Sequence, residues 1–118
     1  MPTLRKAALA GSLLLALARP AAAVDVVVRD FGTVSCGTWL EVRANRSTGD
    51  GVRFAQAREW VSGFISAFNW YTEPPGGDVA WSTDREGMYG WLDLYCREHP
   101  TVGLAKAVEQ LIEHLGSR

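Results

Sequence analysis

Cys36 and Cys96 are the residues whose chemistry the sequence indicates most clearly. They are the two cysteines of the chain, and an even number of cysteines in a small exported protein is typical of a disulfide. The alternative is a metal site, because His99 follows Cys96 in a Cys-Arg-Glu-His pattern. A tetrahedral zinc site requires four ligands, which this pattern does not supply. We therefore predict a disulfide between Cys36 and Cys96 and no metal site.

The sequence contains no pattern that indicates catalysis. No serine or cysteine lies in a nucleophile motif, and the glycines at 49–51 and 76–77 lack the Lys-Ser/Thr of a phosphate-binding loop. The second histidine, His114, is expected near the end of a helix, where a cation interacts favourably with the helix dipole. We predict that the protein is not an enzyme and requires no cofactor.

Residues 1–23 have the features of a signal peptide. Arg5 and Lys6 precede an apolar run of about a dozen residues, and the alanines at 21–23 match a cleavage site. The run is too short to cross the roughly 30 Å core of a bilayer as a helix, although an uncleaved anchor is the alternative interpretation. We predict that the signal peptide is cleaved and that the protein is exported.

The charge of the chain without this signal excludes some classes of partner. Loss of Arg5, Lys6 and Arg19 lowers the number of Lys and Arg from 12 to 9 against 13 Asp and Glu, so the net charge changes from −1 to −4. The remaining cations are scattered singly between acidic residues, so the sequence indicates no basic cluster. Nucleic acids and anionic membranes select clustered positive charge, and neither is expected as a partner.

The hydrophobic pattern predicts an all-α fold: a small four-helix domain at 35–118, preceded by an irregular arm at 24–34. The first helix, 35–46, is expected to be capped by Ser35, and the second covers 52–71. The third begins with the Thr83–Glu86 capping pattern and ends before Pro100. Thr101 is expected to cap the fourth helix, which lies antiparallel to the third. The predicted core faces contain Cys36, Trp39 and Leu40; Phe54, Ala57, Trp60, Val61, Phe64, Ile65, Phe68 and Tyr71; Met88, Tyr89, Leu92, Tyr95 and Cys96; and Leu104, Ala105, Val108, Leu111, Ile112 and Leu115.

Three large apolar residues fall outside these faces and are candidate partner-binding residues: Trp70, Trp81 and Leu94. Trp70 lies on the side of the second helix that carries Gly63 and Ala67. The alternative interpretation is that these two small residues admit another helix and that Trp70 covers the contact.

The chain resembles the HdeA/HdeB periplasmic acid-stress proteins over residues 36–115. The resemblance rests on Gly63, Phe64, Ala67 and Asn69, on Tyr95-Cys96 and Pro100, and on Cys36 followed by Trp39. It implies a four-helix fold with one disulfide and chaperone action at low pH. It also implies a homodimer at neutral pH that loosens on acidification and holds unfolded periplasmic clients soluble.

A second resemblance is to the Tai-type immunity proteins of type VI secretion. It rests on the Gly63-Phe64 helix, on the segment from Tyr95 to Pro100, and on the helix that follows with Ala105 and Leu111. This resemblance implies a periplasmic protein that binds and blocks one toxin. We rank it second because the cysteines of that family are placed differently.

Overall fold

The computed structural model describes residues 27–117. In this range the chain forms four α-helices and no strand, which confirms the predicted all-α fold. The elements are a 3₁₀ helix η1 (Asp30–Thr33), then α1 (Cys36–Ala44), α2 (Gly51–Thr72), α3 (Arg85–Glu98) and α4 (Leu104–Gly116). The predicted signal peptide, 1–23, lies outside the described residues. None of the described helices is both long enough and apolar enough to span a membrane.

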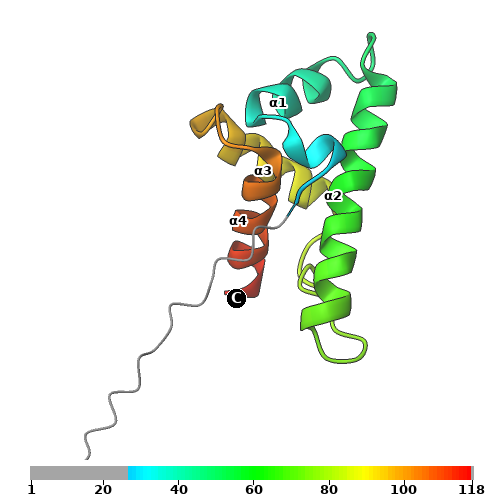
Figure 1. Cartoon of the computed structure of the whole chain (residues 1–118), viewed down its shortest axis with the longest axis vertical. Coiled ribbons are helices and arrows are strands. Elements are labelled where there is room, and N and C mark those ends of the chain that lie inside the picture. Colours follow the sequence, from blue (N-terminus) through cyan, green and yellow to red (C-terminus); the bar gives the residue numbers. More distant parts are fainter. Residues whose placement is uncertain (1–26, 118) are drawn as a thin grey trace, which may run out of the picture.

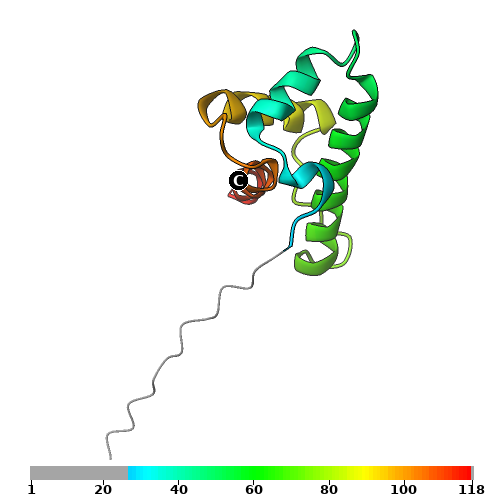
Figure 2. The ribbon, with the colours of Figure 1, turned by 45° about the horizontal axis from the view of Figure 1, so that its top comes forward.

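The longest helix, α2, forms one side of the molecule (Figure 1). α1 and α4 pack against α2, and α3 packs against α1 and α4. α1 packs against α3 at the end of the molecule where α2 begins. The prediction that α3 and α4 are antiparallel is wrong. Their axes lie crosswise: α3 runs sideways and α4 downward in Figure 1, and α4 is seen nearly end-on in Figure 2. The connection between them is held against the start of α1: Cys36 N donates to Val102 O at 2.7 Å, and Gly37 N to Pro100 O at 2.9 Å. These bonds hold the connection in place and so set the direction in which α4 extends from it.

The helix ends confirm one predicted cap and correct two. Ser35 caps α1, its hydroxyl accepting from Thr38 N at 3.3 Å. The cap of α3 is Asp84 instead of Thr83: its carboxylate accepts from Gly87 N at 2.8 Å, and a negative charge at a helix N-terminus is favourable. Thr101 does not cap α4. That helix begins after Gly103, and the Leu104 amide donates to Val34 O at 2.8 Å.

The predicted core is confirmed along α4 and only in part along α2. All six predicted residues of α4 are buried, whereas α2 buries Ala57, Val61 and Ile65 and leaves Tyr71 84% exposed. Tyr71 was expected in the core. The chain after α2 instead returns over the face carrying Asn69, about 200° around the helix from Tyr71. Asn69 accepts from Val79 N at 2.9 Å, and Val79 and Ala80 of this loop are buried.

Part of the predicted N-terminal arm packs against α2 through η1. Gly32 is the buried residue of η1, and it faces the indole ring of Trp60. A Cβ atom at Gly32 would overlap this ring, lying 2.7 Å from Trp60 Cε2. Gly32 therefore allows the close approach of η1 to α2.

We expect Gly32→Ala to lower the free energy of unfolding by about 1–2 kcal/mol, because the methyl group must displace η1 or the half-buried Trp60. Gly63→Ala is the matched control: a Cβ atom there meets nothing within 4 Å. Since alanine favours a helix interior over glycine, the control should be neutral or stabilising by up to about 1 kcal/mol. Urea unfolding followed by circular dichroism measures both. Equal effects of the two variants would contradict the close packing of η1.

Candidate functional site

The three predicted partner-binding residues are all exposed in the folded protein. The exposed fractions are 82% for Trp70, 76% for Trp81 and 62% for Leu94. The alternative, in which a helix covers Gly63 and Ala67, is wrong for the described residues. Both positions are exposed, and a Cβ atom at Gly63 has open space around it. Trp70 therefore lies uncovered beside the equally exposed Tyr71, which the sequence analysis had assigned to the core.

These residues do not form one continuous site. Trp70 lines a groove of about 460 Å³ with the 73–77 loop. Leu94 lines a separate groove on α3, together with Trp91, Tyr95 and Glu98, and Trp81 lines neither. The structure therefore places Trp70 beside the loop and keeps Leu94 apart from it.

Both histidines take part in a row of stacked rings on α3 and α4. His114 stacks on Trp91 with ring centroids 5.4 Å apart, Trp91 on Tyr95 at 5.3 Å, and Tyr95 on His99 at 4.2 Å. His99 also places its Nδ1 atom 2.9 Å from Tyr95 O. Among residues 27–117, no three His, Cys, Asp or Glu side chains are grouped so that they could hold a metal ion.

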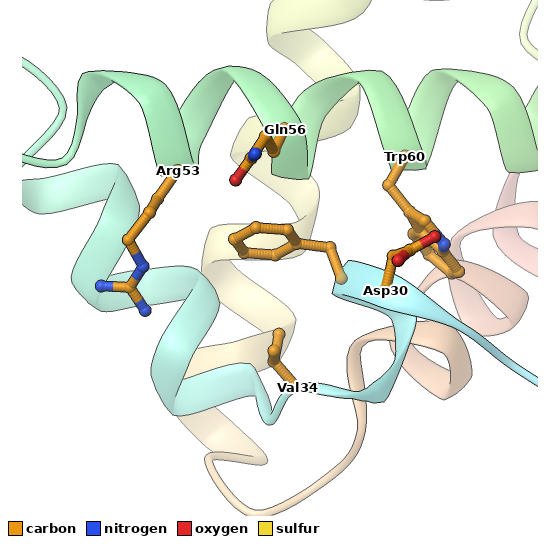
Figure 3. A pocket seen from close by; sticks show the side chains of 6 residues that line it. Asp30, Val34, Arg53, Gln56 and Trp60 are labelled. Atoms are coloured by element: carbon orange, nitrogen blue, oxygen red, sulfur yellow. The ribbon is translucent and has the colours of Figure 1, made fainter.

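A groove of about 610 Å³ lies between η1 and α2 (Figure 3). Arg53, Gln56 and Trp60 project into it from α2, and Asp30 and Val34 come from the segment around η1. The Arg53 guanidinium already contacts the carboxylates of Asp50 at 3.3 Å and Glu41 at 3.9 Å. No serine, cysteine or histidine lines this groove. It can hold an amphipathic group, but its lining residues offer no serine hydroxyl, thiol or imidazole.

A polar network joins α1 to α3 and was missed by the sequence analysis. The Arg43 guanidinium donates to both oxygens of Asp93, with Nη2 to Oδ2 at 2.8 Å and Nε to Oδ1 at 3.1 Å. Trp39 Nε1 donates to the same carboxylate at 2.8 Å. The Arg43 and Asp93 side chains are only 13% and 16% exposed. The hydrogen bonds that the Arg43 guanidinium donates to the Asp93 carboxylate raise the pKa of Arg43 above its ordinary value.

Aromatic rings surround the cation of this network. The Arg43 guanidinium carbon lies 5.8 Å from the ring centroid of Trp39, 5.4 Å from Phe54 and 5.6 Å from Tyr89. Such contacts favour a desolvated cation. One signal in the sequence indicates the network. Asp93 lies four residues after Tyr89 and three before Cys96, so it is a charged residue on the apolar face of its helix.

The predicted disulfide links the same two helices. Cys36 at the start of α1 bonds to Cys96 near the end of α3, with 4.8 Å between their Cα atoms. Both residues are fully buried. α1 and α3 are therefore joined by one covalent link and by one ion pair.

Comparison with models of protein families, with curated proteins and with solved structures found no match. The resemblances to the HdeA/HdeB proteins and to the Tai-type immunity proteins therefore stay predictions.

Proposed function

We propose that the protein is a non-enzymatic periplasmic chaperone of the HdeA/HdeB type, which holds unfolded client proteins soluble during acid stress. The observation that carries the proposal is the pair of unlike links between α1 and α3. The Arg43–Asp93 ion pair requires a charged carboxylate, whereas the Cys36–Cys96 disulfide does not. At about pH 2–3 carboxylates are largely protonated. Acid therefore removes the first link and leaves the second, so the core between the helices can open while the chain stays tethered.

The charge of the whole chain supports an open state in acid. Without the signal peptide, 9 Lys and Arg face 13 Asp and Glu at neutral pH; in strong acid the same cations and 2 His are charged and the carboxylates are not. The net charge thus changes from −4 to about +11. Self-repulsion of this size favours an expanded state that exposes apolar surface. The rings packed around Arg43 would then become available to clients.

A light-scattering assay tests the proposal. The oxidised protein without residues 1–23 is mixed with an aggregation-prone client, acidified to about pH 2–3 and neutralised. We expect scattering to be suppressed when the protein is present during acidification and not when it is added after neutralisation. Unchanged scattering, with the protein itself still compact in acid, would overturn the proposal.

The second candidate function is inhibition of one folded partner, as in an immunity protein. It is favoured by the exposure of Trp70 and Tyr71 in the folded state, next to a loop that Asn69 holds in place. A chaperone that acts after partial unfolding should tolerate Trp70→Ala and Trp81→Ala in the scattering assay. Val52→Ala, at the other end of α2 and 74% exposed, is the control. Loss of activity in both tryptophan variants, but not in Val52→Ala, would favour a fixed binding surface.

A further inference from the structure

The fold brings together three arginines that are scattered in the sequence. Arg43, Arg46 and Arg97 line one open groove of about 350 Å³ with Leu40, Ala44 and Asp93. The first two arginines come from the end of α1 and from just beyond it, and the third comes from the last turn of α3. The sequence shows no basic cluster because Arg97 lies more than 50 residues along the chain from Arg43 and Arg46.

Two of these three guanidinium groups have no acidic partner within the described residues. Arg43 is neutralised by Asp93, whereas no ion pair involves Arg46 or Arg97. Arg46 is nevertheless fixed in place: it donates to Arg43 O and lies over the Phe54 ring, 5.9 Å from its centroid. The groove therefore carries two uncompensated positive charges on a protein whose net charge is negative.

Helix-end electrostatics accounts for each arginine singly. An arginine in the last turn of a helix is favoured by the dipole, which explains Arg43 on α1 and Arg97 on α3, and Arg46 donates to the Arg43 carbonyl at the C-terminal end of α1. It does not explain why two helix ends that both carry arginine meet at one groove. The disulfide and the Arg43–Asp93 pair fix α1 against α3. The helix ends that carry the arginines are thus held together in the folded protein without a ligand, which reduces the entropic cost of binding.

We propose that this groove binds a carboxylate side chain from an acidic segment of a folded protein partner at neutral pH. Guanidinium groups match carboxylates in planar, two-point contacts, and Leu40 and Ala44 offer apolar contact to the neighbouring part of such a segment. A phosphate ester carries a charge of about −1.5 to −2. The Asp93 carboxylate therefore repels a phosphate ester more strongly than it repels a singly charged carboxylate. This role is independent of the proposed action in acid, where carboxylates are protonated.

Fluorescence polarisation with a fluorescein-labelled decapeptide of alternating glutamate and alanine tests the proposal at neutral pH. We expect the affinity to fall by about tenfold or more in the double variant Arg46→Gln, Arg97→Gln. The double variant Arg29→Gln, Arg85→Gln is the control, because it loses the same charge from two exposed arginines that lie outside the groove. It should change the affinity by less than about twofold. Circular dichroism shows that both variants are folded.

Three results would overturn the proposal. No binding of the peptide by the wild-type protein would exclude the site. Equal losses in the two double variants would show general attraction between charges. Displacement of the peptide by inorganic phosphate at constant ionic strength would show a site for small oxyanions instead of an acidic protein segment.

Discussion

Replacing both cysteines by alanine is expected to lower the free energy of unfolding by about 4 kcal/mol. The disulfide joins residues 60 positions apart, and closing a loop of this length restricts the unfolded chain strongly in the chain-entropy model. Both cysteines are fully buried, so the variant also loses packing between α1 and α3. Urea unfolding of the oxidised wild-type protein and of the double variant Cys36→Ala, Cys96→Ala measures the difference.

A loss of this size is a large fraction of the stability of a small domain, typically about 5–15 kcal/mol. The wild-type protein under reducing conditions is the control, because it loses the covalent link and keeps the sulfur atoms in the core. It should lose most of the same stability. If both proteins kept the stability of the oxidised form, the disulfide would contribute little, and the tether that the proposed function requires would be unsupported.

The parts of the fold that the sequence predicts are those governed by regular spacing. The apolar stripe of α4 repeats at three and four residues, and all of its members are buried. The disulfide follows from the number of cysteines, and Ser35 follows from its place before a helix. In each case the controlling interaction is local or is the only pairing available, so no knowledge of the tertiary structure is needed.

The parts that the sequence did not predict depend on how distant segments meet. Asn69 lies outside the predicted core face of its helix, yet its amide holds the following loop through Asp78 and Val79. Tyr71 continues the apolar spacing of α2 but lies where no neighbour covers it. Spacing reports which side of a helix a residue occupies and not which other element covers that side.

The candidate site was missed for the same reason. Asp93 becomes the partner of Arg43 only because α3 lies against α1, and Arg97 reaches the groove of Arg46 for the same reason. Charges 50 residues apart in the chain cannot be paired from the sequence. An acidic residue on an apolar helix face indicates that a partner exists without identifying it.

Asp93→Asn is expected to lower the free energy of unfolding at neutral pH by about 2–3 kcal/mol, because it leaves the Arg43 charge half-enclosed without a counter-ion. The figure lies below that for a fully buried pair, since both side chains retain some exposure. Glu109→Gln is the matched control: its pair with Lys106 has a similar distance of 2.9 Å but lies on the surface. Because exposed pairs contribute little, this control should leave the stability unchanged. Adding Arg43→Met to Asp93→Asn should recover part of the loss.

The difference in unfolding free energy between the wild-type protein and Asp93→Asn should shrink as the pH falls. The pKa of Arg43 is raised in the folded state. Its contribution to the free energy of unfolding is therefore present below the arginine pKa of the unfolded chain. That contribution is lost only as the pH rises through the pKa of Arg43 in the folded protein. Arginine stays charged throughout the acid and neutral range, whereas carboxylates as a class lose their charge in strong acid. Unfolding free energies measured from pH 7 to about pH 2 should therefore converge for the two proteins as the pH falls. A constant difference across this range would show that the ion pair is not the link that acid removes, and the proposed opening between α1 and α3 would lose its trigger.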